Sequence, residues 1–358
     1  MTNTSIRTGK PWLDTNGVRI QAHGGSVFFK DGLYYWYGEN KEKTVKGSQV
    51  WHWGVRCYAS KDLYNWEDKG LLIPPEPGDP NSPLYPSVCM DRPHILFNEK
   101  SQKYVCWLKI MEGGDRQSMT ILTADDFLGP YTMLKTGYQP YGLSSGDFDL
   151  GLDPQTGKAY IYFEKVHTEI ICADLSEDFT GVTGQYSSHF PRSHPPFVRE
   201  APVHFTRNGK HYLFTSGTTG YYPNEFEAAV AEDWHGPYTL LGNPHPGDRA
   251  RTSFNSQITD VLKVENTDLY IAVADRWLPN HPGSLLVTKL ISRKFDRAFN
   301  PERRARRLKE AQSHPDQKPR KMDNHNTAFA DYVWLPIRFE GDMPIMDWKD
   351  EWRIEDYA

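Results

Sequence analysis

The chain has 358 residues, of which 38% are hydrophobic and 13% aromatic, enough to bury a sizeable core in one closed all-β unit. A net charge of −5, with 26 Pro and 28 Gly spread along the chain, argues against a disordered or a generally nucleic-acid-binding protein. The four cysteines lack CxxC spacing and lie mostly among apolar residues. This pattern favours reduced thiols over disulfides or a zinc site, so we expect no metal-ligating residues.

The first 14 residues lack the basic-then-apolar pattern of a signal peptide, and no stretch approaches the ~18 apolar residues that a membrane span needs. We therefore expect a cytoplasmic protein, or a secreted one if a leader has been removed. Contacts with membranes or nucleic acid are not expected. One domain over residues 1–358 is the expected organisation.

A strand–turn–strand unit, often rich in aromatic residues, occurs five times and is usually followed by a more polar strand pair. Equivalent points lie 53 to 68 residues apart, at Gly25, Pro93, Asp149, Pro202 and Ile258. Such a period is typical of blades, so the sequence predicts an all-β fold, a five-bladed β-propeller with about four strands per blade around a central channel. A β-sandwich would not need the period.

In chain order, the predicted hairpins comprise residues 25–37, 93–108, 148–163, 203–216 and 258–273. In the fourth hairpin, the turn pair Asn208-Gly209 suits backbone with positive φ. Pro202 is expected to open the first strand of this hairpin and to keep Ala201 extended. The backbone that carries Glu200 into the strand would then be rigid.

One segment interrupts the fifth unit, over residues 279–324. Within it, residues 293–321 carry 11 basic and 4 acidic side chains. A charge run of this kind is more often a solvated surface than a nucleic-acid site. We interpret the segment as a basic, partly helical insertion in the fifth blade, on the rim or at a subunit contact, with strand pairing resuming at residues 332–337.

In a propeller, the innermost strand of each blade points its first residues toward the channel, so polar groups from distant parts of the chain converge there. The groups in question are His23 and Glu39 of the first unit, Asp91 of the second, Asp147 of the third, Glu200 of the fourth and Gln257 of the fifth. Taken singly, each is more often a hydrogen-bonded turn residue. Like charges that converge on a channel are unfavourable unless they serve a ligand, so the recurrence predicts a site.

Eight short motifs lie at the edges of the predicted strands: Gln21-Ala22-His23-Gly24-Gly25, Tyr35-Trp36-Tyr37-Gly38-Glu39, Asp91-Arg92-Pro93, Ser145-Gly146-Asp147, Glu200-Ala201-Pro202, Thr215-Ser216-Gly217-Thr218-Thr219-Gly220, Asn255-Ser256-Gln257 and Asp275-Arg276-Trp277. As a set they resemble family 43 glycoside hydrolases, which are five-bladed propellers, and most resemble the exo-β-1,3-galactanase branch. The resemblance covers nearly the whole chain except the basic insertion. It implies an inverting, exo-acting glycoside hydrolase that releases a terminal sugar, above all galactose from β-1,3-galactan-type glycans.

The resemblance also implies roles for single residues. Glu200 matches the general acid, and Asp147 matches the carboxylate that orients this acid and tunes its pKa. Glu39 and Thr218 match sugar-binding positions. Asp91 stands where this branch usually has glutamate, and its shorter reach leaves the exact sugar open.

The general base is the least conventional part of the expected site. Most family members carry an aspartate at the start of blade one, where this chain has Ala22-His23. The galactanase branch shares that absence and uses a blade-five glutamine, which Gln257 matches. An unperturbed amide is a poor base, so it must position the water or act as its imidic-acid tautomer, with Glu39 or Asp91 as the conventional alternative. Inversion asks for roughly 6.5–9.5 Å between the acid and the group that holds the water.

The expected substrate-binding set is completed by His23, Trp277 and Tyr221. Trp277 and Tyr221 would bind by stacking on a sugar face. The chain has many aromatic residues, however, and core packing is the commoner role for any one of them. The expected partner is an oligo- or polysaccharide substrate. No cofactor is required, and a structural calcium ion and the oligomeric state are left open.

Other activities stay open at this point. A β-galactofuranosidase or α-L-arabinofuranosidase would use the same fold, since a furanose would fit a pocket altered at Asp91. A non-enzymatic glycan-binding propeller would keep the aromatic residues but lack a working acid, and the presence of Glu200 with Asp147 argues against it. An inverting phosphorylase would need a cluster of basic groups for phosphate, whereas each candidate arginine adjoins an acidic residue.

Overall fold

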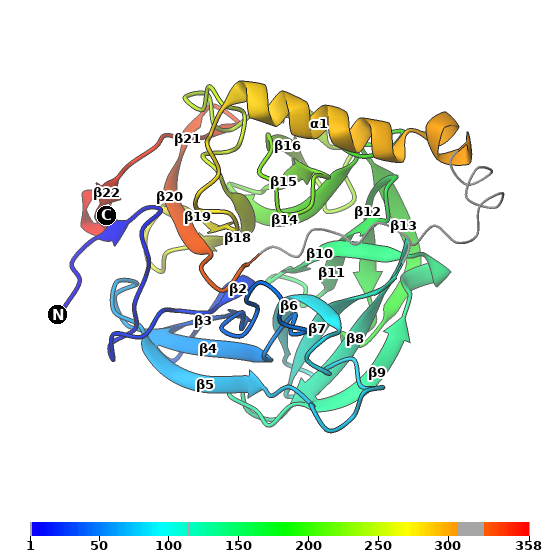
Figure 1. The fold of residues 1–358 in the computed structure, drawn as a ribbon. Helices are drawn as coiled ribbons and strands as arrows, with labels where there is room; N and C mark the ends of the chain where they lie inside the picture. The colour runs from blue at the N-terminus through cyan, green and yellow to red at the C-terminus, as the bar shows by residue number, and fades with distance from the viewer. Residues whose placement is uncertain (1, 114, 307–325, 358) are drawn as a thin grey trace.

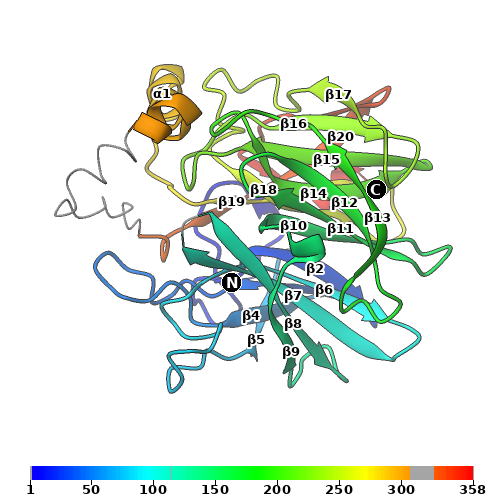
Figure 2. The ribbon, with the colours of Figure 1, turned by 90° about the vertical axis from the view of Figure 1, so that its right-hand side faces the viewer.

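The computed structural model describes residues 2–113, 115–306 and 326–357, and it contains five four-stranded antiparallel sheets arranged around a central axis (Figure 1). Within each sheet the strands pair in chain order, so the first strand of each blade lies innermost. The five-bladed β-propeller predicted from the repeat is therefore confirmed. Turned by 90°, the blades are seen edge-on around the channel (Figure 2).

The first two blades are formed by β2 (His23–Lys30), β3 (Leu33–Glu39), β4 (Val55–Ser60) and β5 (Glu67–Ile73), and by β6 (Cys89–Asn98), β7 (Lys103–Gly113), β8 (Arg116–Ala124) and β9 (Thr132–Tyr138). The third is formed by β10 (Ser145–Leu152), β11 (Ala159–Lys165), β12 (Glu169–Leu175) and β13 (Val182–His189). The fourth is formed by β14 (Arg199–Arg207), β15 (Lys210–Gly217), β16 (Glu227–Ala231) and β17 (Thr239–Gly242). The fifth is formed by β18 (Gln257–Lys263), β19 (Tyr270–Arg276), β20 (Asp331–Glu340) and β21 (Met343–Met346).

The hydrophobic core is divided into five clusters, each packed between two neighbouring blades. The cluster between blades one and five is dominated by indole rings, with Trp36, Trp66 and Trp334 in mutual edge contacts. The two chain ends pair as β1 (Ile6–Arg7) and β22 (Glu351–Trp352), and they contribute Ile6 and Trp352 to this cluster. The ring is thus closed by apolar packing and by a strand pair between the termini (Figure 1).

Turn chemistry sets the strand register where the sequence analysis placed it. Asn208 and Gly209 have φ angles of 52° and 77°, and the residues on either side of them, Arg207 and Lys210, face each other across the β14–β15 hairpin. The four cysteines are free thiols, as expected. Among the described residues, no helix is both long and apolar enough to cross a bilayer.

A β-bulge interrupts the innermost strand of every blade near its start. The bulges lie between His23 and Ser26, Asp91 and His94, Ser145 and Phe148, Glu200 and Val203, and Ile258 and Asp260. Each places one extra residue on the inner strand, which bends the strand and re-aims the adjacent side chain. The candidate site residues Asp91, Asp147 and Glu200 therefore lie at bulges, where the regular pairing of the inner strand with its neighbour is interrupted.

The bulge in blade four corrects one expectation. Pro202 lies inside β14 and does not open it, and Ala201 is left-handed, with φ of 48°, not extended. The bulge residue of blade four shares its positive φ with the equivalent Gly24 and Arg92 of blades one and two, at 61° and 52°. Glu200 is nevertheless held rigidly, because Ala201 is fully buried.

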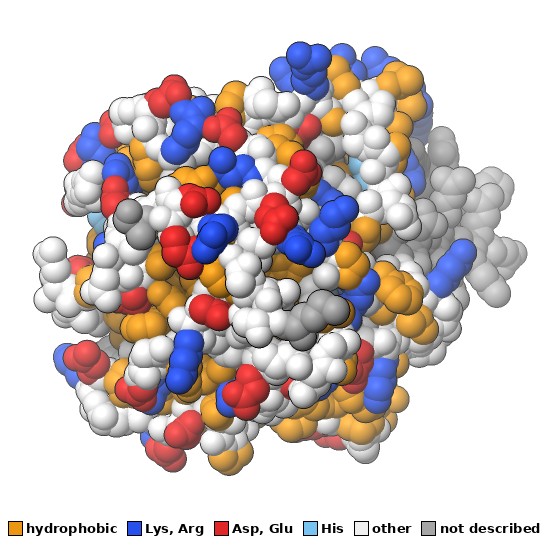
Figure 3. Space-filling model, turned by 90° about the vertical axis from the view of Figure 1, so that its left-hand side faces the viewer, with side chains coloured by type: hydrophobic (Ala, Val, Ile, Leu, Met, Phe, Trp, Pro, Cys, Tyr) orange, Lys and Arg blue, Asp and Glu red, His pale blue; other side chains and the backbone are white. Residues whose placement is uncertain are grey.

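The predicted basic insertion contains α1 (Leu285–Phe299), between β19 and β20 (Figures 1 and 2). The helix packs along the rim: His194 Nε2 lies 2.8 Å from Asp296 Oδ1, and the ring of Phe295 faces Gly220. Its basic side chains are exposed, and blue Lys and Arg side chains gather at this edge of the molecule in Figure 3. Residues 307–324 of the predicted insertion lie outside the described residues. Short 3-10 helices occur at η1 (Pro140–Gly142) and η2 (Ile354–Tyr357).

Candidate active site

One network of side chains joins blades two, three and five at the bulged ends of their inner strands. Arg92 Nε lies 3.2 Å from Asp147 Oδ2, and Arg92 Nη2 donates to Gln257 Oε1 at 3.0 Å. Lys109 Nζ lies 2.6 Å from Asp147 Oδ1 and 3.1 Å from Asp91 Oδ2. The structure therefore brings together three of the residues that the sequence analysis selected.

Glu200 and Asp147 are buried carboxyl groups whose pKa values are shifted in opposite directions. Burial raises the pKa of Glu200 well above its usual range, and the negative charge of Asp147 adds to the effect. Burial alone would also raise the pKa of Asp147, but the adjacent Arg92 and Lys109 hold it well below its usual range. Two carboxyl groups shifted apart in this way suit different roles: the protonated form of Glu200 and the ionised form of Asp147 are favoured.

The cations of this network are the functional residues that the sequence analysis missed. Lys109 lies in the middle of β7, in the buried run Val105–Ile110, and its own side chain is almost fully buried. A lysine inside an apolar strand is unfavourable unless it is paired, so this position carried a readable signal. Arg92 carried no such signal, because its partner Asp147 comes from another blade, whereas Lys41 pairs with Glu39, only two residues away in the chain.

Asp91 and Glu39 are both held by neighbouring donors. Asp91 Oδ1 accepts a hydrogen bond from Trp51 Nε1 at 2.8 Å, and despite burial the nearby lysines lower the pKa of Asp91. Glu39 is 2% exposed, with Lys41 Nζ 2.6 Å from Oε2 and the backbone N–H of Arg92 donating to Oε1 at 3.0 Å. Burial raises the pKa of Glu39 to about 7. Glu39 thus holds the bulged backbone at Arg92 and presents little surface to a ligand.

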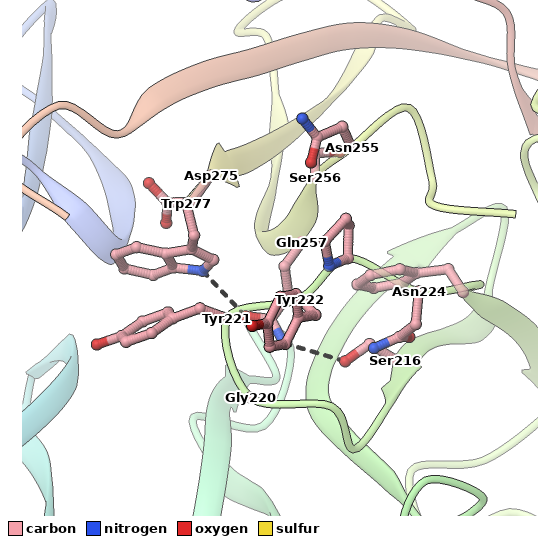
Figure 4. A pocket seen from close by; sticks show the side chains of 12 residues that line it. Ser216, Gly220, Tyr221, Tyr222, Asn224, Asn255, Ser256, Gln257, Asp275 and Trp277 are labelled. Atoms are coloured by element: carbon pink, nitrogen blue, oxygen red, sulfur yellow. Dashed lines mark hydrogen bonds between the residues drawn. The ribbon is translucent and has the colours of Figure 1, made fainter. Parts of the chain in front are cut away.

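The amide of Gln257 has a single chemically consistent orientation. Its Oε1 accepts hydrogen bonds from Arg92 Nη2 at 3.0 Å and Trp277 Nε1 at 3.3 Å, and its Nε2 donates to Ser216 Oγ at 3.1 Å (Figure 4). Guanidinium and indole groups can only donate, so a flipped amide would place two donors against its own NH₂ group. The oxygen of Gln257 is therefore fixed toward Arg92 and Trp277.

A narrow pocket opens beside Gln257. It is lined by Ser216, Gly220, Tyr221, Tyr222, Pro223, Asn224, Phe226, Asn255, Ser256, Gln257, Asp275 and Trp277 (Figure 4). The rings of Tyr221 and Trp277 lie 5.1 Å apart, and Trp51 continues this aromatic wall at 5.9 Å from Tyr221. Glu200 adjoins the pocket through Ser216, its partner in the β14–β15 ladder.

Two predicted substrate-binding residues are held by internal hydrogen bonds beside the pocket. His23 is fully buried, with Nδ1 2.8 Å from Asp275 Oδ1 and Nε2 3.3 Å from the Tyr332 hydroxyl. The Thr218 hydroxyl is also buried and donates to the carbonyl oxygen of Val198 at 3.0 Å. Both groups have internal partners: His23 lies at the junction of blades one and five, and Thr218 lies under the loop that follows β15.

Replacing His23 by alanine should destabilise the propeller by about 1–3 kcal/mol, because a buried hydrogen-bonded group is lost and Asp275 is left under-paired. Denaturant unfolding would measure the change. The control is His281→Ala, whose ring lies outside the blades and should change stability by about 0.5 kcal/mol or less. Unchanged stability combined with weakened sugar binding would instead return His23 to the substrate-binding set.

Comparison with known proteins decides the family. The model of glycosyl hydrolases family 43 matches residues 21–271. The chain belongs to this family. The match begins just before β2 and ends within β19, so it spans the inner strands of all five blades.

Solved structures agree with this assignment. A family 43 β-1,3-galactosidase is 27% identical with a TM-score of 0.76, and the match covers 99% of this chain and 64% of that protein. A second family 43 β-1,3-galactosidase, with galactodeoxynojirimycin, is 25% identical with a TM-score of 0.75, covering 98% and 100%. An exo-β-1,3-galactanase from Phanerochaete chrysosporium, with β-1,3-galactotriose, has the same fold at 24% identity and a TM-score of 0.75, covering 98% and 68%.

The chain thus spans just under two thirds of the length of the first of these relatives. No curated protein matches it. The predicted resemblance to family 43, near its exo-β-1,3-galactanase branch, is confirmed. Among the described residues, no group of three His, Cys, Asp or Glu side chains is arranged to hold a metal ion.

Proposed function

We propose that this glycoside hydrolase removes terminal galactose from β-1,3-galactan-type glycans, acting from the chain end and with inversion. The observation that carries the proposal is the pair of carboxyl groups, Glu200 and Asp147, whose pKa values are shifted in opposite directions. Arg92 contacts both Asp147 and the amide of Gln257, which stands in place of a conventional base. The β-1,3-galactosidases and exo-β-1,3-galactanases among the similar structures support the choice of sugar and linkage.

In this proposal Glu200 is the general acid. Burial raises its pKa well above the usual range and so favours the protonated form, which can give a proton to the glycosidic oxygen as the bond to the anomeric carbon breaks. Asp147 remains ionised and acts as a positioning residue, because its negative charge helps to keep the proton on Glu200.

Gln257 is proposed to hold the attacking water. An imidic acid would carry a proton on Oε1, where Arg92 and Trp277 already donate, so the contacts favour the ordinary amide. The Nε2 group bonds to Ser216 with one hydrogen and has a second hydrogen for the oxygen of a water. Arg92 Nη1 has no hydrogen-bond partner among the described residues, and its N–H groups would suit a sugar hydroxyl beside this water.

The decisive experiment is hydrolysis of β-1,3-galactotriose followed by proton NMR. We expect free galactose to appear first as the α-anomer, together with β-1,3-galactobiose. Aryl β-galactofuranoside and aryl α-L-arabinofuranoside should be poor substrates. Initial release of the β-anomer would contradict inversion, and a clear preference for either furanoside would overturn the choice of sugar.

Replacing Asp147 by asparagine should move the high-pH limb of the rate profile to lower pH. Removing this negative charge lowers the pKa of Glu200, and Lys109 and Arg92, left without Asp147, lower it further. Glu200 must be protonated to act, so activity is lost at a lower pH than in the wild type. The measurement is kcat/KM against pH, with Asp153→Asn as a control on the same blade, since this half-buried carboxylate lies outside the network. An unshifted limb would remove Asp147 from its proposed role.

A further inference from the structure

A second constellation of polar side chains lies at the junction of blades three and four. It comprises Asp174 on β12, Ser187 and His189 on β13, and His235 between β16 and β17. A shallow pocket opens beside it, lined by Ser187, Ser188, His189, Phe190, His235, Gly236, Pro237 and Tyr238. None of these residues belongs to the network at the candidate active site.

Three hydrogen bonds link these side chains in a row. His235 Nε2 lies 2.6 Å from Asp174 Oδ1, His235 Nδ1 lies 3.0 Å from Ser187 Oγ, and Ser187 Oγ lies 2.8 Å from His189 Nε2. An ionised carboxylate only accepts, so a neutral His235 carries its proton on Nε2 and has a lone pair on Nδ1. Ser187 then donates its hydroxyl proton to His235, and its oxygen accepts from His189.

We propose that Ser187, His235 and Asp174 form a second hydrolytic site, which cleaves small carboxylic esters of alcohols. A nucleophilic hydroxyl needs a base within hydrogen-bond reach and a third group that orients that base, and the two distances of 3.0 and 2.6 Å satisfy both conditions. Ser187 is half-buried, and the side chains of His235 and Asp174 are 35% and 38% exposed, so a substrate can reach them.

The reaction needs only water as co-reactant. Ser187 Oγ bonds to the ester carbonyl carbon while its proton passes to His235 Nδ1. The carbon–oxygen bond to the alcohol breaks, and the alcohol leaves with that proton. Water then attacks the acyl group on Ser187 and gives a proton to His235. The bond from the acyl carbon to Ser187 Oγ breaks, the proton returns to Ser187, and the carboxylic acid is released.

His189 supplies the stabilising donor. Its Nε2 lies next to the nucleophilic oxygen, so the N–H can turn to the carbonyl oxygen as negative charge develops there. Burial lowers the pKa of His189 to about 4, so the ring is neutral at neutral pH. Phe190 and Tyr238 form the apolar part of the pocket wall, which suits a short acyl chain such as acetyl, with the alcohol left in solvent.

A similar chain of groups elsewhere provides an internal control. Ser193 Oγ lies 2.9 Å from His194 Nδ1, and His194 Nε2 lies 2.8 Å from Asp296 Oδ1. Among the described residues, no second histidine donates to Ser193, and this serine lines neither of the pockets described above. If a hydrogen-bonded serine, histidine and aspartate were sufficient for catalysis, both Ser187 and Ser193 would hydrolyse esters. The proposal requires that only Ser187 does so.

The experiment uses the full-length protein and p-nitrophenyl acetate. Ser187→Ala and His235→Ala should each lower kcat/KM by about 10²-fold or more, the order expected for loss of nucleophilic or general-base catalysis. Ser193→Ala should retain the wild-type rate, and Ser187→Ala should retain hydrolysis of galactosides. Incubation of the wild type with a fluorophosphonate, followed by peptide mass spectrometry, should place the label on Ser187.

The labelling measurement needs no variant, so it decides the matter even if Ser187→Ala folds poorly. The same side chains also fasten the His235 segment to blade three, and Tyr162 adds a hydrogen bond to the carbonyl of Trp234 at 2.7 Å. A purely structural role would leave Ser187 unlabelled and would leave ester hydrolysis unchanged in a folded Ser187→Ala variant. Either result would overturn the proposal.

Discussion

Replacing Glu200 by glutamine should leave the propeller folded and lower the rate on natural glycosides by about 10²–10⁴-fold, the range for one general acid. The amide keeps the size of the side chain but has no proton for the leaving oxygen. Burial already favours the neutral form of the Glu200 carboxyl, because it holds its pKa well above the usual range. A neutral amide therefore replaces a neutral acid, and the thermal midpoint should change little.

The dependence on leaving group separates loss of the acid from general damage to the site. Aryl galactosides with good leaving groups need less protonation, so Glu200→Gln should lose less rate on them than on galactan oligomers. Glu232→Gln is a suitable control, since this carboxylate is exposed and follows β16 in the same blade. Equal losses on both kinds of substrate would contradict the assignment of Glu200 as the acid.

The sequence alone allows the fold to be predicted because propeller blades repeat. Each blade buries its faces against its two neighbours, so every unit needs the same strand–turn–strand pattern, and the four spacings between the five units reveal it. Local turn chemistry adds the register in blade four, since Asn208 and Gly209 accept positive φ without strain. The bulges are harder to foresee. Ala201 adopts φ of 48° although its side chain gives no local preference for that conformation.

The candidate site could be predicted only in outline. Motif positions gave Glu200, Asp147 and Gln257, but the cations that shift or fix these groups come from other blades. Lys109 and Arg92 reach Asp147 across blade boundaries, and sequence spacing cannot encode which side chain faces another across a channel. Their pairing with carboxylates emerges only after the ring closes.

The buried motif residues show a second limit. His23, Thr218 and Glu39 occupy their expected positions in the chain, yet each is held by an internal partner. A motif fixes which residue stands at a strand edge, whereas the bulge and the neighbouring blade decide where its side chain points. Positions that resemble sugar-binding residues of the family are thus tied to loops and blade junctions by internal contacts, which their sequence positions do not reveal.

Replacing Gln257 by alanine should reduce glycoside hydrolysis by about 10²-fold or more while galactose binding persists. Tyr221 and Trp277 would still wall the pocket, so the sugar retains its stacking surface. The attacking water, in contrast, loses the amide that orients it. Rate measurements on galactan oligomers, combined with calorimetric titration of galactose, separate the two effects.

Gln257→Glu is the matched variant, because a carboxylate can accept from Arg92 and Trp277 as the amide oxygen does. A carboxylate can also take a proton from water, so we expect this variant to keep more activity than alanine. Its added negative charge near Glu200 raises the pKa of the acid. Glu200 would then stay protonated to higher pH, and the high-pH limb of the profile should move upward.

The outcome for Glu39 distinguishes the two candidate bases. Glu39 holds the Arg92 backbone, and burial raises its pKa to about 7, which is close to the value that suits a general base at neutral pH. If Gln257→Ala stays within a few-fold of the wild type and Glu39→Gln abolishes turnover without unfolding the protein, Glu39 is the base and the amide only fixes Arg92. If Glu39→Gln retains most of the rate, the water is held by Gln257, and the carboxylate of Glu39 serves to fix the bulge beneath it.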